Sequence, residues 1–147
     1  MAYNIALHTH QSKSDACNFR PVEFTNWNAV VDKWIINGKD NDDNTLHMGG
    51  SGVSGGIRFS SDKTEEQFIV FVGVHNYVRW CDIVVDPGER STATALHPVY
   101  YQEGSPQANN RWRTLAHCTA KNKHGRAINL TYTVGTGNNL KADLVIG

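Results

Sequence analysis

Residues 128–146 read INLTYTV-GTGNN-LKADLVI. Apolar and polar residues alternate in 128–134 and again in 140–146, which is the period of a strand with one buried face. Gly135, Gly137 and Asn138 lie between the two runs, where a chain reversal needs residues that tolerate positive φ. This stretch therefore predicts a β-hairpin and a protein built mainly of sheet.

Strand patterns continue toward the N-terminus. Residues 3–7 and 57–59 alternate in the same way, while residues 68–72, FIVFV, are apolar on both faces. A strand without a polar face is typical of the middle of a sheet that is covered on both sides. Residues 37–44, NGKDNDDN, are rich in turn-forming residues and predict a loop. Their clustered Asp and Asn do not predict a calcium site, because they lack the glycine and distal glutamate spacing of an EF-hand loop.

Helical spacing interrupts this pattern at Tyr77, Trp80, Cys81 and Val84. These positions predict a short helix with Asn76 as its N-cap and Asp82 on its exposed face. Residues 95–102 predict a second short helix. The whole pattern predicts an all-β-dominated, two-layer sandwich with a short helical connection, in a single domain of residues 1–147.

The balance of charges narrows the choice of partner. Fourteen Lys+Arg against fourteen Asp+Glu leave no basic excess for nucleic acid or for an anionic membrane surface. The N-terminus has no signal-peptide pattern, and the three cysteines form no CxxC pair. We expect a cytoplasmic chain with reduced thiols, no cofactor, and a neutral partner.

Residues 50–55, GSGVSG, match the dinucleotide-binding pattern GxGxxG. That fingerprint binds a pyrophosphate only where the glycines end a strand and open a helix. Here the segment leads into the strand pattern of residues 57–59. It is therefore interpreted as a turn, or as a bare loop whose backbone N–H groups and Ser51 and Ser54 hydroxyls could meet the hydroxyls of a ligand.

The seven histidines invite a metal or catalytic interpretation. His8 and His10 share a strand face, but a zinc site needs a third ligand. Ser51, His75 and Asp82 can be drawn as a triad, yet no nucleophile elbow or family signature accompanies them. We therefore predict no catalytic residue and no metal site.

Two further groups remain open between a structural and a binding role. His75 and Asn76 fit a strand end and a helix cap, or a pair that hydrogen-bonds a sugar beside the Gly/Ser loop. Arg111 and Arg113 alternate with Trp112 as on a strand, where an edge or interface role and ligand contact are equally compatible. The four tryptophans are each expected in the core.

Several segments resemble the fungal fruit-body lectin family. They are residues 19–23 (FRPVE), 47–59 (HMGGSGVSGGIRF), 73–84 (GVHNYVRWCDIV) and 132–147. The resemblance covers essentially the whole chain. It implies an actinoporin-like β-sandwich whose two sheets are connected by a short helix-loop-helix, assembled as a homotetramer. It also implies a cytosolic sugar-binding protein without enzymatic activity or required metals, with a role in defence.

The resemblance implies a primary site for galactosyl and N-acetylgalactosamine glycans of glycoproteins or glycolipids, including the T-antigen disaccharide. The positions that carry it over, with the neighbouring histidine, are Ala29 or Val30, Ser51, Gly52, His75 and Asn76. The chain is one residue shorter than the family between Trp27 and Trp34, which leaves Ala29 and Val30 as alternatives.

A second site, for terminal N-acetylglucosamine, is implied by the same resemblance. Its positions are Asp82, Ile83, Val85, Arg111 and either His117 or Cys118. Asp82 and Ile83 match the family, whereas Val85 replaces a threonine and Arg111 is the nearest substitute for an arginine. Because a buried polar group left unpaired costs about 1–3 kcal/mol, we predict that binding of N-acetylglucosamine is weakened or changed.

The implied fold is shared with actinoporins, so a pore-forming membrane protein is the alternative function. Actinoporins insert an amphipathic N-terminal helix into the membrane, and such a helix has a recognisable pattern. Residues 3–7 predict a strand instead. We therefore predict no membrane insertion.

Overall fold

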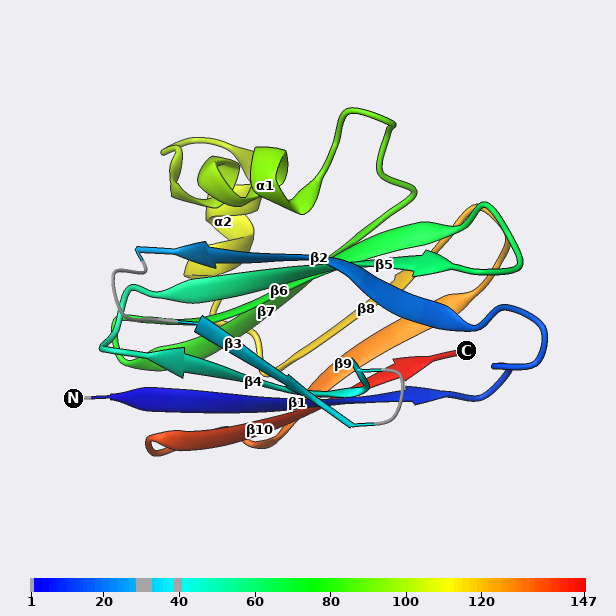
Figure 1. Ribbon diagram of the computed structural model, residues 1–147. Helices are drawn as coiled ribbons and strands as arrows, with labels where there is room; N and C mark the ends of the chain where they lie inside the picture. Colours follow the sequence, from blue (N-terminus) through cyan, green and yellow to red (C-terminus); the bar gives the residue numbers. More distant parts are fainter. Residues whose placement is uncertain (1, 29–32, 39–40) are drawn as a thin grey trace.

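The computed structural model describes residues 2–28, 33–38 and 41–147. In this part of the chain two sheets pack face to face, which confirms the predicted sandwich (Figure 1). The six-stranded sheet contains, in spatial order, β3 (Lys33–Asn37), β4 (Asp43–Met48), β1 (Tyr3–Gln11), β10 (Asn139–Ile146), β9 (Ala127–Val134) and β8 (His117–Lys121). The four-stranded sheet contains β2 (Phe19–Trp27), β5 (Ser54–Ser61), β6 (Gln67–His75) and β7 (Val78–Val85).

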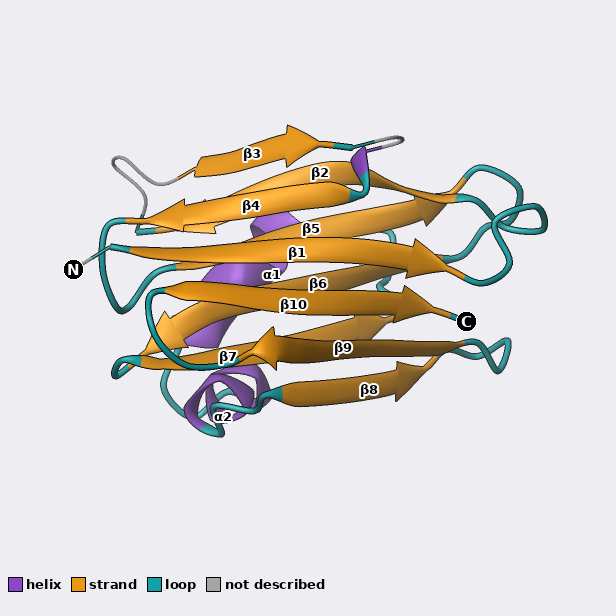
Figure 2. Cartoon of the chain, turned by 90° about the horizontal axis from the view of Figure 1, so that it is seen from below, coloured by secondary structure: helices purple, strands orange, loops and turns teal. Residues whose placement is uncertain are grey.

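The hairpin predicted at residues 128–146 is confirmed as β9 and β10, which pair antiparallel. Strand β1 lies between β10, to which it is parallel, and β4, to which it is antiparallel (Figure 2). The N-terminal segment is therefore a strand bonded along both edges, as its alternation predicts. The loop predicted at residues 37–44 is shorter than expected, because Asn37 ends β3 and Asp43 and Asn44 begin β4. Residues 39 and 40 lie outside the described part.

Strand β6 is covered on both faces, as its continuous apolar pattern predicts. Phe68, Val70 and Val72 belong to the core between the sheets. Ile69 and Phe71 point the other way, into a second cluster that includes Trp80 of β7, Ala93 and Tyr100. The sandwich therefore has a second apolar layer on the outer face of its four-stranded sheet.

A helical connection supplies this second layer (Figure 1). It contains α1 (Ala93–Leu96), the 3₁₀ helix η2 (His97–Tyr101) and α2 (Pro106–Trp112), and it joins β7 of one sheet to β8 of the other. The helix predicted at residues 95–102 corresponds to α1 and η2. No helix in the described residues is long and apolar enough to cross a membrane.

The helical connection is held by one carboxylate, on Glu23, and one hydroxyl, on Ser105. Glu23 on β2 accepts hydrogen bonds from the backbone N–H groups of Ala93 and Thr94, at 2.8 and 3.0 Å. It also forms an ion pair with Arg58, with Nε and Oε1 2.8 Å apart. Ser105 caps α2 by accepting from the N–H of Ala108 at 3.0 Å. These bonds satisfy N–H groups that a helix leaves unpaired at its first turn.

The helix predicted at residues 77–84 is wrong, because these residues form β7. Trp80 and Val84 pack under the helical connection, while Cys81 faces the core between the sheets. Apolar side chains on both faces of a strand destroy the two-residue period and here coincide with helical spacing. Asp82 is accordingly half-buried on a strand rather than exposed on a helix.

The strand predicted around residues 111–113 is also wrong. Arg111 and Trp112 end α2, and Arg113 is its C-cap. The prediction that every tryptophan is buried holds for Trp34 and Trp80, whereas Trp112 is 51% exposed. A seven-residue helix is too short to display a clear period, so its charged and aromatic residues resembled an alternating strand.

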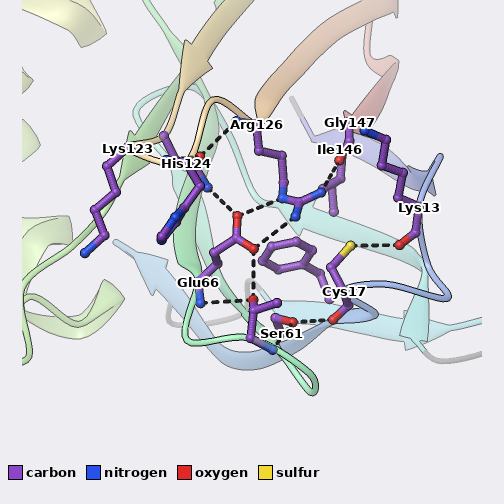
Figure 3. A network of polar contacts seen from close by, with 12 residues as sticks. Lys13, Cys17, Ser61, Glu66, Lys123, His124, Arg126, Ile146 and Gly147 are labelled. Atoms are coloured by element: carbon purple, nitrogen blue, oxygen red, sulfur yellow. Dashed lines mark hydrogen bonds and ion pairs between the residues drawn. The ribbon is translucent and has the colours of Figure 1, made fainter.

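A buried ion pair holds together the end of the sandwich away from the β6–β7 turn (Figure 3). Glu66 Oε1 accepts from Arg126 Nε at 2.8 Å and from Asn122 Nδ2 at 2.7 Å. Arg126 Nη2 donates to Glu66 Oε2 at 3.0 Å, and Arg126 Nη1 donates to the carbonyl of Gly147 at 2.7 Å. The hydrogen bonds from Arg126 bring the pKa of Glu66 down from 4.5 to about 2, against the opposing effect of burial.

Candidate functional site

The Gly/Ser loop and the β6–β7 turn meet at one end of the four-stranded sheet. The N–H of Gly52 donates to the carbonyl of Val74 at 2.8 Å, and the N–H of Val74 donates to the carbonyl of Val53 at 3.0 Å. The N–H of Tyr77 donates to Ser51 Oγ at 2.9 Å. The structure thus brings together two segments that lie about 25 residues apart in the chain, as a binding role for both would require.

Glycine is needed at position 52, where φ is +89°. A side chain there would strain the backbone although the space around the Cα is open. The loop continues into β5, so residues 50–55 open a strand and not a helix. This confirms the interpretation of GSGVSG as a turn, since no helix N-terminus follows to face a pyrophosphate.

Asn76 is a turn residue and not a helix cap. It has φ of +48° and Tyr77 has φ of +64°, values that define a type I′ hairpin turn between β6 and β7. The side chain of Asn76 is exposed and makes no hydrogen bond within the described residues. Its amide can both donate to and accept from a hydroxyl beside Ser51.

His75 ends β6, as predicted, and packs against α2 next to this turn. Its Nδ1 lies 2.7 Å from Arg111 Nη1, and its ring meets that of Trp112 edge-on at 4.3 Å. A guanidinium only donates, so Nδ1 accepts and the proton of the neutral ring is on Nε2. Burial, and then the charge of Arg111, lower the pKa of His75 and keep the ring neutral.

This geometry does not form the triad that could be drawn from the sequence. The residue paired with His75 is a cation, whereas a triad needs a carboxylate in that place. Ser51 accepts from the backbone of Tyr77, and Asp82 bonds elsewhere. The described residues contain no group of three or more His, Cys, Asp and Glu side chains placed to hold a metal, and His8 and His10 pair with each other at 4.5 Å between ring centres.

Arg111 belongs to the surroundings of the primary positions rather than to those of Asp82. Besides His75, its Nε donates to the carbonyl of Tyr100 at 2.8 Å, and its guanidinium lies 4.6 Å from the centre of the Tyr101 ring. Only 6% of the residue is exposed. Arg111 therefore connects α2 and η2 to the end of β6. Its Nη2 also lies 4.0 Å from Glu103 Oε1, at the limit of an ion pair.

Asp82 is bonded to the helical connection. Its Oδ2 accepts from the Tyr100 hydroxyl at 2.6 Å and from Asn110 Nδ2 at 3.1 Å. Burial, together with the charge of Asp82, raises the pKa of Tyr100, so this hydroxyl stays protonated and donates. The carboxylate that the second site would use is therefore already held by two protein donors.

Of the other second-site positions, Ile83, Val85 and Cys118 face the core between the sheets and His117 does not. Ile83 and Val85 pack against the core between the sheets. Cys118 is buried there too, and a hydrogen bond with Cys81, together with burial, raises its pKa. His117 is exposed and its Nδ1 lies 2.6 Å from Thr131 Oγ1, on the opposite face of β8. Of the two alternatives left open, Cys118 faces β7 and His117 faces away.

The prediction that the Ser54 hydroxyl could meet a ligand is wrong, because Ser54 is buried in an internal polar cluster with His97, Tyr101 and Thr25. Ser54 Oγ lies 2.7 Å from His97 Nε2 and 2.6 Å from the Tyr101 hydroxyl, and His97 Nδ1 lies 2.8 Å from Thr25 Oγ1. Burial lowers the pKa of His97 from 6.5 to about 4. Ser54 and His97 are 0% and 2% exposed, so this cluster joins β2, β5 and η2 internally. No local pattern could have revealed it, since its members lie far apart in the chain.

Ala29 and Val30 lie outside the described residues. The structure therefore assembles Ser51, Gly52, His75 and Asn76 in one place, with Arg111 behind them. Of the second set, Cys118 lies close enough to Asp82 to interact with its charge, whereas His117 faces away and Ile83 and Val85 pack against the core. What the primary positions offer is an uncharged edge of one half-buried hydroxyl, one exposed amide and bare backbone, which suits the recognition of neutral hydroxyls.

Comparison with known proteins shows which family has this fold. The model of the fungal fruit body lectin family matches residues 1–144. The chain is 40% identical to Boletus edulis lectin over 145 residues, 99% of each chain. Crystal structures of the Xerocomus chrysenteron lectin, in wild-type and mutated forms, match with a TM-score of 0.88, at 36% and 37% identity, over 100% of this chain and 99% or more of theirs.

The chain belongs to the fungal fruit body lectin family. Its general function is accordingly that of a carbohydrate-binding lectin.

Proposed function

We propose that this lectin binds galactosyl and N-acetylgalactosamine glycans, including the T-antigen disaccharide, at Ser51, Gly52 and Asn76. Ala29 or Val30 would add a contact, and His75 would hold the turn that carries Asn76. The observation that carries the proposal is the bond from Tyr77 N–H to Ser51 Oγ, which joins the loop and the turn into one uncharged edge. A neutral sugar is recognised by such donors and acceptors without any net field.

Substitution of the exposed amide tests this site directly. Asn76→Ala removes the amide while leaving the backbone bonds of the turn, so the affinity for the disaccharide should fall at least tenfold in isothermal titration. Asn37→Ala, at an exposed end of β3, is the matched control and should bind as the wild type does. Unchanged binding by Asn76→Ala would show that the primary site is misassigned.

The second site is proposed to be weak. Asp82 is engaged by Tyr100 and Asn110, and Val85 offers no hydroxyl and packs against the core. Titration with N-acetylglucosamine should therefore give much weaker binding than the galactosyl disaccharide. Clear electron density for this sugar beside Asp82, in a crystal soaked with it, would contradict the proposal.

We further propose that the lectin acts as a homotetramer, because single sites for neutral sugars are weak and repeated sites raise avidity. Analytical ultracentrifugation measures the assembly, and red-cell agglutination inhibited by the disaccharide measures its consequence. A monomer that agglutinates nothing would contradict both parts.

The remaining expectations are proposed on the same basis. The protein is neither an enzyme nor a membrane-inserting toxin: β1 is bonded along both edges, and the pairing of His75 with Arg111 leaves no general base at the site. Liposome leakage caused by the protein would contradict the absence of membrane insertion.

A cytoplasmic location fits the three free, buried cysteines and is checked by cell fractionation. A defensive role is tested by feeding assays, with Asn76→Ala as the inactive control.

A further inference from the structure

Beside the candidate site, the β6–β7 turn faces the β9–β10 turn across a cleft of about 190 Å³. Both turns lie at the same end of the sandwich (Figure 2). Tyr77 and Val78 line the cleft from one side, and Gly135, Thr136 and Gly137 line it from the other. Since Tyr77 is also the residue whose N–H bonds Ser51, the cleft begins where the candidate site ends.

Tyr77 is an unusual residue for its position. It has φ of +64° at the second central position of a type I′ turn, where glycine fits best. It is the one aromatic residue among the described non-glycine residues with positive φ. Its side chain is 78% exposed and makes no hydrogen bond or ring contact within the described part of the chain. A strained, exposed aromatic residue stabilises neither the turn nor the core, and such strain is typical of binding sites.

The size and chemistry of the cleft indicate what it could hold. Its volume lies below the range of about 300–1,000 Å³ that is usual for a pocket enclosing a whole ligand. Tyr77, Val78 and Leu140 offer apolar surface, while Thr136 and the backbone of the glycine turn offer polar groups. A sugar ring has the same two characters, an apolar C–H face and a rim of hydroxyls.

The Arg79 guanidinium also lines the cleft, and no acidic residue among those the structure describes forms an ion pair with it. It donates from Nη1 to the carbonyl of Thr114 at 3.3 Å. The Arg79 guanidinium is therefore a further hydrogen-bond donor for a hydroxyl of a sugar ring that packs on Tyr77.

We propose that this cleft extends the candidate galactosyl site, and that Tyr77 is a specificity-determining residue which stacks on the next sugar of a bound oligosaccharide. The inference rests on the proposed function. It adds that the lectin distinguishes longer neutral glycans from the disaccharide by contacts outside Ser51, Gly52 and Asn76.

The test compares affinities for a β-galactosyl disaccharide and for tri- and tetrasaccharides that extend it, by isothermal titration. The wild type should bind the longer glycans more tightly. Tyr77→Gly suits the left-handed turn, keeps the N–H that bonds Ser51 and removes only the ring. The ratio of its affinity for the longer glycans to its affinity for the disaccharide should fall about three- to tenfold, the worth of one aromatic stacking contact. Asn41→Gly relieves a positive φ at the far end of β4 and is the matched control.

Thr136→Trp fills the cleft from the opposite turn and should produce the same selective loss. If the wild type gains nothing from the longer glycans, or if both variants retain the gain, the extension does not exist. If the wild type does not bind the disaccharide at all, the proposed function has failed instead. The two failures are therefore distinguishable.

Discussion

At the scale of single residues, Glu66 shows how strongly one carboxylate can hold distant segments. Its side chain is 5% exposed and that of its partner Arg126 is 16% exposed. The carboxylate receives donors from the β5–β6 loop and from the β8–β9 turn, which belong to different sheets. The pair thus joins the two sheets (Figure 3).

Removal of this carboxylate should be costly. Glu66→Ala removes the acceptor of Arg126 Nε and Nη2 and of the Asn122 amide and leaves a largely buried guanidinium without its counter-charge, so the free energy of unfolding should fall by about 3 kcal/mol. Urea denaturation followed by tryptophan fluorescence measures the change. Glu65→Ala, at the exposed neighbouring position, should lie within about 0.5 kcal/mol of the wild type. Equal stability of the two variants would refute the importance of the pair.

The candidate site illustrates what could be predicted at this scale. Ser51, Gly52 and Asn76 were identifiable because glycines, a hydroxyl and an amide cluster in two short, recognisable segments. Arg111 was misplaced because its partner, His75, is 36 residues away and only the packing of α2 brings them together. Contacts between distant segments depend on the tertiary fold, which local patterns do not contain.

At the scale of elements, the hairpin β9–β10 and the strands β1 and β6 followed from their patterns. Strand β7 did not, because the helical connection covers its outer face and removes the polar partners that mark a strand. The pattern would have indicated a strand only if the position of α1 and η2 were known. Misprediction of β7 and the existence of the second apolar layer therefore have the same cause.

The close approach of β5, β6 and β7 gives a prediction for this scale. A Cβ at Gly73 would lie 2.6 Å from Ser54 Cβ and 2.7 Å from the carbonyl oxygen of Val53, and the second of these is backbone that cannot rotate away. Gly73→Ala should therefore reduce the free energy of unfolding by about 1–3 kcal/mol, the usual cost of overpacking.

The matched control is Gly88→Ala, whose Cβ would meet only Ser91 Oγ at 3.8 Å. Thermal unfolding should leave this variant close to the wild type. Since Gly73 precedes Val74, which bonds the Gly/Ser loop, Gly73→Ala should also weaken binding of the disaccharide. A Gly73→Ala protein with wild-type melting temperature and binding would show that the strands have room to separate.

At the scale of the whole molecule, the chain has no net charge, yet its stability should depend on pH. Burial raises the pKa of Glu23, but hydrogen bonds from Thr94 and Arg58 outweigh it and bring the value from 4.5 to about 2. Glu66 reaches the same value. The buried His97 titrates at about 4 instead of 6.5, and the pKa of His75 is lowered too.

All four groups act in the same direction. The unfolded chain protonates its histidines as the pH falls through 6.5 and its glutamates as it falls through 4.5, whereas the folded chain takes up these protons only at lower pH. Unfolding therefore binds protons, and the folded state loses stability as the medium becomes acidic. Full stability is expected above pH 6.5, with one loss between pH 6.5 and 4 and a second between pH 4.5 and 2.

The two losses can be separated by substitution. In urea titrations at intervals between pH 8 and 3, His97→Gln should flatten the first decline and retain the second, while Glu66→Gln should retain the first and reduce the second. Absolute stabilities will differ, because both variants lose hydrogen bonds, so the slopes against pH are the quantity to compare. If the slope of His97→Gln between pH 6.5 and 4 matches that of the wild type, protonation of this buried histidine does not limit the acid stability of the sandwich.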